Sequence, residues 1–248
     1  MSTYAVYFSP TRTNERNATA IAEVFGDVKH LNFTNPDKVQ DVVMTKDDVA
    51  VFAAPVYGGR IFKGAMERFS HVKGEGTPCI AVATYGNRHY DDALLELCDA
   101  LKAQGFIVVA AFAPIGEHTF GQIQVGRPNE EDIAQTVAQT KLVKEKIEKG
   151  EFGEIAVPGN RPYKDGGNGG GFRPLTEGCI GCGVCKNLCP MGAIDDEFKV
   201  INDKCIACFA CVKGCPVGAK HLDAAYDEFC AGFNVSFKHS FSTTQHIS

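Results

Sequence analysis

Tryptophan is absent from the 248 residues of this sequence, and so is any hydrophobic run long enough to cross a membrane. A membrane-spanning helix requires about 20 consecutive apolar residues. The apolar stretch at residues 4–8 is also too short for the core of a signal peptide, and polar residues follow it directly. The sequence therefore predicts a cytoplasmic protein with no membrane partner.

Positive charge is not in excess either. The chain has 25 Lys and Arg residues against 30 Asp and Glu residues, which gives a formal net charge of −5 at pH 7. Proteins that bind nucleic acid usually present a basic surface to the phosphates. The balance of charge therefore argues against a nucleic acid partner.

Cysteine, in contrast, is abundant, with 11 residues. Because the cytoplasm keeps thiols reduced, a disulfide framework is disfavoured and metal binding is the leading interpretation. Cys79 and Cys98 lie in apolar patterns that are typical of a buried core, and Cys230 has no predicted role.

The first 150 residues alternate short β-branched runs with helical patterns, which is typical of an α/β doubly wound parallel sheet. Ala18, Ile21, Ala22 and Phe25 form one apolar helical stripe after the first run, and Asn129 is a good N-cap for the last helix. Five strands are expected, at residues 4–8, 28–33, 49–53, 79–84 and 106–112. Among several strand orders, 2-1-3-4-5 opens a ligand crevice at the carboxyl ends of strands one and three.

Regular structure is predicted to stop after this unit. Residues 156–171 end in a run that holds Gly166, Gly167, Gly169, Gly170 and Gly171, and such a run favours a flexible linker. The predicted organisation is an α/β domain at 1–155, this linker, a small α+β domain at 172–222 and a tail at 223–248 without an assigned role.

An internal repeat follows the linker. Residues 179–194 read CIGCGVCKNLCPMGAI and residues 205–220 read CIACFACVKGCPVGAK, with an offset of 26 residues. Both contain C-x2-C-x2-C-x3-C-P, in which three cysteines bind one [4Fe-4S] cluster and the fourth binds the cluster of the other repeat. Zinc sites usually pair two C-x2-C knuckles without a third cysteine in register, so iron–sulfur clusters are favoured over zinc.

The repeat therefore predicts two [4Fe-4S] clusters with crossed ligands. The first-motif cluster takes Cys179, Cys182, Cys185 and Cys215, and the second-motif cluster takes Cys205, Cys208, Cys211 and Cys189. Residues 172–222 resemble bacterial two-cluster ferredoxins, which implies electron transfer. The small residues Gly181, Gly183, Ala207 and Ala210 are expected to let backbone N–H groups approach the cluster sulfurs.

Hydroxyl and amide side chains crowd the segment after the first strand. Ser9, Thr11, Thr13 and Asn14 surround the start of a helix, whose N-terminus favours an anion, so a phosphate site is predicted. The same residue types are also ordinary helix caps, and this alternative stays open. No G-x-G-x-x-G follows the strand, which favours a mononucleotide over a dinucleotide.

Two further loops are expected at the same edge of the sheet, APVYGGR at 54–60 and TYGNRHYDDALLEL at 84–97. With them the sequence resembles the fusion of a flavodoxin-like domain with a two-cluster ferredoxin that is found widely in anaerobic bacteria and archaea. The resemblance implies a flavodoxin-like fold and bound FMN, with the phosphate at residues 9–14 and the isoalloxazine between Tyr57 and Tyr85. The implied FMN-binding residues are Ser9, Thr11, Arg12, Thr13, Asn14, Pro55, Val56, Tyr57, Gly58, Gly59, Tyr85, Gly86, Asn87 and Tyr90.

One position departs from the flavodoxin pattern S/T-x-T-G-N-T, because Arg12 stands where the glycine belongs. If this position needs a positive φ, an arginine is strained there. Alternatively, the Arg12 guanidinium makes a charged contact with the phosphate.

The implied function is electron transfer, because clusters carry single electrons and a flavin accepts one or two. We expect a carrier that relays electrons between the clusters and FMN and that meets a low-potential redox protein with a basic face. The alternative is a reductase that uses the same relay to reduce a small-molecule acceptor, with Tyr57, Arg60, Arg88 and His118 as candidate catalytic residues. An empty flavodoxin-like interaction module and a homodimer are further alternatives.

Overall fold

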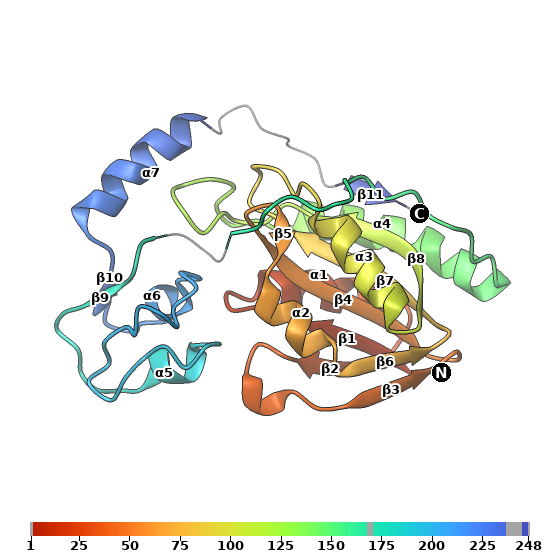
Figure 1. The fold of residues 1–248 in the computed structure, drawn as a ribbon, viewed down its shortest axis with the longest axis horizontal. Coiled ribbons are helices and arrows are strands. Elements are labelled where there is room, and N and C mark those ends of the chain that lie inside the picture. The colour runs from red at the N-terminus through yellow and green to blue at the C-terminus, as the bar shows by residue number, and fades with distance from the viewer. Residues whose placement is uncertain (1, 168–170, 237–244, 248) are drawn as a thin grey trace.

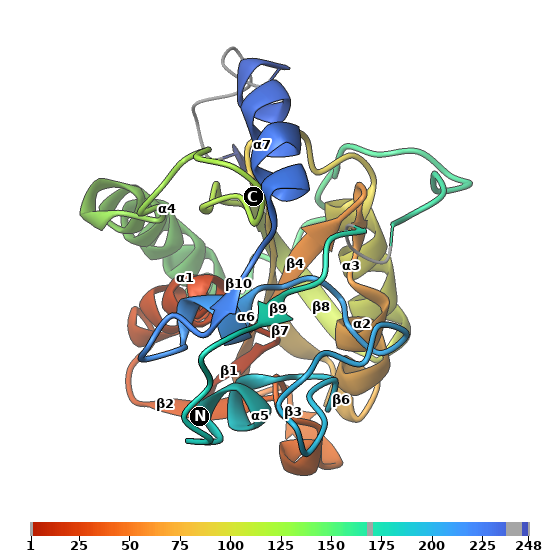
Figure 2. The ribbon, with the colours of Figure 1, turned by 90° about the vertical axis from the view of Figure 1, so that its left-hand side faces the viewer.

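A computed structural model describes residues 2–167, 171–236 and 245–247. The larger part of the chain is an α/β unit, and the part that holds the cysteine repeat lies beyond the carboxyl ends of its strands (Figure 1 and Figure 2). Helix α7 (Ala224–Ser236) stands beside both parts. None of the helices in these ranges is long and apolar enough to cross a membrane.

The central sheet contains five parallel strands in the order β2-β1-β4-β7-β8. Their bounds are Val28–Asn32 for β2, Thr3–Tyr7 for β1, Val49–Tyr57 for β4, Thr77–Thr84 for β7 and Phe106–Ala113 for β8. In chain order these strands follow the predicted sequence 2-1-3-4-5, so the predicted doubly wound sheet is confirmed.

Two strands extend the sheet beyond the five that were expected. β5 (Arg60–Ile61) pairs antiparallel with the end of β4 through a turn at Gly58 and Gly59, whose φ angles of 61° and 85° suit glycine. β4 therefore continues four residues further than predicted. β11 (Gln245–Ile247), from the tail, pairs antiparallel with β8 at the sheet edge.

Helices cover both faces of the sheet because successive side chains along each strand point to opposite sides. On one face α1 (Thr13–Glu23) and α4 (Glu130–Lys149) pack over a core that includes Tyr7 and Val51. On the other face α2 (Lys63–Phe69) and α3 (Ala93–Ala103) cover Phe8 and Phe52. Asn129 caps α4 in a capping box with Asp132, as the sequence predicted for its start.

A small second sheet was not predicted. It consists of β3 (Val42–Thr45) and β6 (Val72–Glu75), which pair in parallel. The short 3-10 helix η1 (Pro36–Lys38) precedes β3 in the chain. Its strands are only four residues long, so their sequence pattern is too short to separate from a loop.

The part with the cysteine repeat contains little regular structure. It has the antiparallel pair β9 (Leu175–Thr176) and β10 (Lys220–His221) and the short helices α5 (Val184–Leu188) and α6 (Ala210–Lys213). α5 and α6 occupy equivalent positions in the two repeats. The repeat in sequence is therefore also a repeat in structure.

The segment before it, predicted to be a flexible linker, lacks regular structure but is held in place. The backbone N–H groups of Asn160 and Lys164 donate to the Asp92 carboxylate at 2.8 and 2.7 Å, and Arg161 is paired with Asp99 of α3 at 2.6 Å. The described residues of the segment are thus fastened to the α/β unit by charge-assisted bonds. Its glycines Gly169 and Gly170 lie outside the described residues.

Candidate functional site

The eight cysteines of the two motifs form two separate groups. Each group lines its own small cavity. One cavity is lined by Cys179, Cys182, Cys185 and Cys215. The other is lined by Cys189, Cys205, Cys208 and Cys211. The structure therefore brings together the same two crossed sets that the motif spacing predicted. Among the described residues no three His, Cys, Asp or Glu side chains converge on a point suited to a single metal ion.

Backbone N–H groups approach the cysteine sulfurs in the same way in both repeats. Gly181 and Ala207 donate to the Sγ atoms of Cys179 and Cys205 at 3.4 Å in each case. Two residues later in each repeat the backbone is left-handed, with φ of 76° at Gly183 and 57° at Phe209. Hydrogen bonds to cluster sulfurs raise the reduction potential, so this geometry fits an iron–sulfur site.

A buried cation lies between the two groups of cysteines. Lys220 is 3% exposed, and its ammonium donates to the neutral hydroxyl of Thr176 at 2.5 Å and to the carbonyl of Phe198. Burial raises the pKa of the Cys185 and Cys211 thiols, and the nearby Lys220 charge opposes this rise in both. A buried cation requires negative charge close by, which thiolate-bound clusters supply.

The two groups differ in their access to solvent. Cys179 and Cys182 are exposed, whereas Cys208 is largely covered and burial raises the pKa of its thiol to about 12. Ile206 belongs to the core of the α/β unit, and Cys208 packs against this core. The second-motif site therefore faces the α/β unit, and the first-motif site faces solvent.

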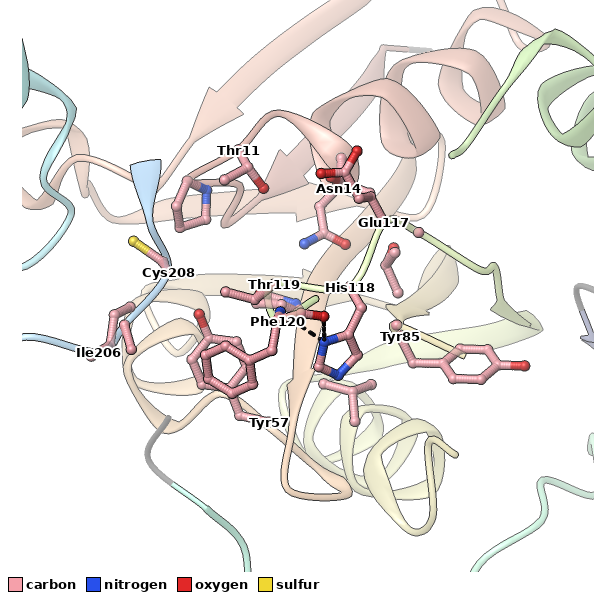
Figure 3. A pocket seen from close by; sticks show the side chains of 18 of the residues that line it. Thr11, Asn14, Tyr57, Tyr85, Glu117, His118, Thr119, Phe120, Ile206 and Cys208 are labelled. Atoms are coloured by element: carbon pink, nitrogen blue, oxygen red, sulfur yellow. Dashed lines mark hydrogen bonds between the residues drawn. The ribbon is translucent and has the colours of Figure 1, made fainter. Parts of the chain in front are cut away.

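A cavity of about 330 Å³ opens at the carboxyl ends of the central strands (Figure 3). Its volume is within the range of small-ligand sites. The predicted FMN-binding residues that line it are Ser9, Thr11, Thr13, Asn14, Pro55, Val56, Tyr57, Gly58, Tyr85 and Gly86. The structure thus gathers all three predicted loops around one space.

The loop that was predicted to hold phosphate surrounds the N-terminus of α1. Ser9 Oγ accepts from the backbone N–H of Glu15 at 3.0 Å, so this hydroxyl also acts as a helix cap. Thr11 and Thr13 line the cavity. The Asn14 amide donates to the carbonyl of Phe8 at 3.0 Å, while its buried Oδ1 has no hydrogen-bond partner among the described residues.

Arg12 has the left-handed backbone that its place in the pattern demands, with φ of 66°. Its guanidinium points outward, with the side chain 78% exposed, and pairs with Glu15 at 2.9 Å. The residue does not line the cavity. A non-glycine residue in this region costs roughly 1–2 kcal/mol, so the loop holds strain at this position.

The two tyrosines that were expected to flank a flavin differ in orientation. Tyr57 lines the cavity, packs on Phe62 at 5.1 Å between ring centroids, and has its pKa raised well above the usual range by burial and by the nearby Cys208 and Cys205. The Tyr85 ring is 3% exposed in the core against Tyr90, and Figure 3 shows it turned away from the cavity. Only Tyr57 therefore offers its ring to a ligand.

Other predicted residues lie outside the cavity lining. Gly59, Asn87 and Tyr90 do not line it, and a Cβ at Gly59 would come within 2.2 Å of the Asp91 side chain. Arg60 donates to both carboxylate oxygens of Glu96, at 2.8 and 2.5 Å, and to the carbonyl of Lys164. Arg60 thus anchors the segment before the cysteine repeat.

Arg88 and His118, the other candidate catalytic residues, do line the cavity. The His118 ring lies so close to Gly86 that a Cβ there would come within 2.3 Å of it. Burial lowers the pKa of His118 to about 4, and the positive charge of Arg88 adds to this effect, whereas a hydrogen bond to Phe120 opposes it. His118 is therefore a neutral imidazole at pH 7.

Sequence reasoning missed two parts of the cavity wall. Of the loop that follows the fifth strand only His118 was named, although the rule that located the other loops was sufficient to find Glu117, Thr119 and Phe120 as well. Residues 206–208 and Phe229 come from the cysteine repeat and the tail. No sequence pattern predicts which surface of a separate unit docks there.

Contacts around the cavity join the two units and the tail. Glu117 is paired with Lys213 of α6. Phe120 contacts Phe209 at 5.7 Å and Phe229 at 5.9 Å between ring centroids, and the Tyr226 hydroxyl bonds the backbone of residues 119 and 121 at 3.4 Å. α7 thereby covers one side of the cavity.

Comparison with known proteins identifies the unit that carries the repeat. Residues 174–216 match the 4Fe-4S dicluster domain family. This segment is an iron–sulfur domain. The chain therefore joins an α/β sheet of flavodoxin-like strand order to an iron–sulfur domain, and its function is redox chemistry and electron transfer.

Other relatives are more distant. An uncharacterized protein of Methanocaldococcus jannaschii is 26% identical over 137 residues, which are 52% of this chain and 91% of that protein. A flavodoxin from the domain Archaea has a TM-score of 0.39 at 14% identity, covering 60% of this chain and 99% of its own. The rubredoxin oxygen:oxidoreductase of Desulfovibrio gigas has a TM-score of 0.40 at 12% identity, covering 60% of this chain and 36% of its own.

Proposed function

We propose that this protein relays single electrons between two [4Fe-4S] clusters and an FMN held in the 330 Å³ cavity. The clusters exchange one electron at a time and the flavin one or two, so together they convert between the two kinds of redox chemistry. The ligands are the two crossed sets of cysteines described above. FMN is held by the predicted residues that line the cavity.

The observation that carries the proposal is the position of Cys208. This residue lines both the large cavity and the small cavity of the second-motif cysteines, and Ile206 does the same. Each of these two side chains thus lies between the two proposed cofactor sites. The second-motif cluster is accordingly the one next to the flavin.

The chemistry of the lining supports a flavin mononucleotide. The hydroxyls of Thr11 and Thr13 and the N-terminus of α1 provide donors for a phosphate. The buried Oδ1 of Asn14 receives no hydrogen bond from the part of the chain that the structure describes, and a ribityl hydroxyl supplies such a donor. The Tyr57 ring supplies an aromatic face, and its hydroxyl stays protonated at neutral pH.

Docking of the iron–sulfur domain keeps the two sites at a fixed separation. Arg68 donates to the carbonyl of Pro190 at 2.6 Å, and Glu117 pairs with Lys213 on the other side of the cavity. These contacts support transfer within one molecule. Because of these contacts, the separation of the two sites does not depend on the flexible linker that the sequence predicted.

A reductase for a small acceptor is the second candidate. Arg88 and His118 reach the cavity from two different loops and offer a charged and a neutral donor to such a molecule. Phe120 and Phe229, however, cover the cavity from the side of the tail. This cover favours a carrier, in which no substrate has to enter beside the flavin.

The proposal is tested with anaerobically reconstituted, full-length protein. We expect about eight irons per chain and FMN as the released flavin, by metal analysis and mass spectrometry. Stopped-flow reduction at several protein concentrations should give a constant rate of electron transfer from cluster to flavin. A rate that scales with concentration, or FAD in place of FMN, would refute the relay as proposed.

A further inference from the structure

The two cysteine motifs present equivalent faces to different surroundings. A shift of 26 residues relates Ile180 to Ile206, and the matching hydrogen bonds to Cys179 and Cys205 show that the relation holds in space. Ile206 is 8% exposed because it packs into the core of the α/β unit. Ile180 is 64% exposed.

The same contrast holds for the rest of the face. Pro190 is buried and Met191 packs against the α/β core, whereas their equivalents Pro216 and Val217 are exposed, Val217 by 51%. The equivalent cysteines differ likewise, since Cys182 is exposed and Cys208 is half-buried. Apolar groups around a cluster are thus covered in the second motif and open in the first.

The covered face shows what kind of surface fits it. The α/β unit presents Tyr57 beside Cys208 and places the Arg68 guanidinium on the carbonyl of Pro190 at 2.6 Å. The complementary surface is therefore apolar at its centre, is cationic at its rim, and holds a redox cofactor behind it. The equivalent face of the first motif has the corresponding backbone carbonyl at Pro216, so it suits a surface of the same kind.

We infer that Ile180, Cys182, Pro216 and Val217 form the docking surface for a separate one-electron redox protein with a basic rim. Each oxidised four-iron cluster with its four thiolates adds a net negative charge to this domain, which favours a cationic partner. The formal charge of −5 acts in the same direction. We name this set of four residues the first-motif face.

The inference rests on the proposed relay and adds the step at which electrons enter or leave the protein. One electron passes in each encounter, so that the partner is oxidised by one electron as the first-motif cluster is reduced by one, or the reverse. The sequence of sites is then partner, first-motif cluster, second-motif cluster and flavin cavity. Solvent-facing Cys182 and flavin-facing Cys208 mark its two ends in the iron–sulfur domain.

The test uses the reduced holoprotein and oxidised cytochrome c, a small one-electron carrier with a basic face. Stopped-flow mixing gives the second-order rate constant for the wild type and for Ile180→Lys and Val217→Lys. Val43→Lys is the matched control, because Val43 lies on β3 with 61% exposure and the same change in net charge results. Iron content and the visible spectrum confirm that each variant keeps its clusters.

We expect Ile180→Lys and Val217→Lys to lower the rate constant at least about tenfold, and Val43→Lys to change it less than about twofold. Equal rates for the face variants and the control would overturn the inference. So would a wild-type dimer in sedimentation that Ile180→Lys dissociates, because a second copy would then occupy the face. The transfer rate from cluster to flavin, measured separately, reports on the relay itself, so a failure of the relay is distinguishable from a failure of docking.

Discussion

The Nη2 of Arg68 donates to the carbonyl oxygen of Pro190 at 2.6 Å, across the boundary between the α/β unit and the iron–sulfur domain. The Nη1 of the same guanidinium donates to the carbonyl oxygens of Phe33 and Thr34, at 2.9 and 2.6 Å. Because Pro190 follows Cys189, this single side chain links the edge of the sheet to a predicted ligand of the second-motif cluster. Docking and cluster geometry are therefore coupled.

Replacement of Arg68 by methionine is expected to slow electron transfer from cluster to flavin by about tenfold. The substitution removes charge-assisted hydrogen bonds, each worth roughly 1.5–3 kcal/mol, and leaves the buried Pro190 carbonyl without its donor. Lys63→Met is the matched control, since Lys63 lies on the same helix with its side chain 81% exposed. Equal transfer rates in both variants would contradict a role for Arg68 in docking.

Crossed ligation predicts opposite outcomes for two equivalent cysteines. Cys189→Ser should remove the second-motif cluster and abolish reduction of the flavin through the clusters, although Cys189 belongs to the first motif. Cys215→Ser should remove the first-motif cluster and leave the cluster next to the flavin. Iron content should fall to about four per chain in each variant. Electron paramagnetic resonance and flavin reduction kinetics would contradict the crossed assignment if the two phenotypes were exchanged.

Local patterns in the sequence predicted the parallel sheet and the two cysteine sets, because short-range periodicity and cysteine spacing are visible without a structure. The strand order followed from the resemblance to flavodoxin-like domains, since the pattern alone allows several orders. The orientation of Tyr85 was not predictable in this way. Its loop is polar and has a glycine next to it, yet its ring turns into the core against Tyr90.

The contacts that hold the units together were also beyond the sequence. Gly166 and Gly167 suggested a flexible linker, but the preceding residues are fastened by Asp92 and Asp99, which lie about 70 positions earlier in the chain. Such long-range ion pairs leave no periodic signal. The tail was unassigned for the same reason, because the aromatic side chains of α7 contact Phe120, Phe172 and Phe209, which lie far from it in the sequence.

Removal of the aromatic cover is expected to weaken flavin binding. Phe229→Ala should raise the dissociation constant for FMN about tenfold, since the side chain lines the cavity and packs on Phe120 at 5.9 Å. Phe152→Ala is a suitable control because Phe152 is 41% exposed, compared with 40% for Phe229, and does not line the cavity. Fluorescence titration of the flavin-free protein measures both constants. Equal affinities would mean that α7 does not cover the flavin.

The buried imidazole of His118 makes stability depend on pH. Its pKa is about 4 in the folded protein, because burial disfavours the charged form, against about 6.5 when unfolded. The folded state therefore binds fewer protons, and stability that is present above pH 6.5 is lost as the pH falls toward 4, by up to about 1.4 kcal/mol per unit. His118→Gln should flatten this fall in thermal unfolding between pH 7 and 5, whereas His71→Gln, at an exposed histidine, should keep it. A wild-type slope in His118→Gln would refute the assignment.

The buried ammonium of Lys220 is expected to raise the reduction potentials of the clusters. Lys220 is 3% exposed and its charge acts on Cys185 of one set and Cys211 of the other. A nearby positive charge stabilises the more negative, reduced form of a cluster, so Lys220→Met should shift both potentials to more negative values by tens of millivolts.

Lys186→Met is the matched control, because it removes the same charge from an exposed side chain of the same domain that is paired with Asp196 at 2.6 Å. Charge in contact with solvent is screened, so the control should shift the potentials much less. Redox titration followed by electron paramagnetic resonance measures both clusters in each variant. Equal shifts in the two variants, or a shift to more positive values in Lys220→Met, would show that the buried ammonium does not set the cluster potentials.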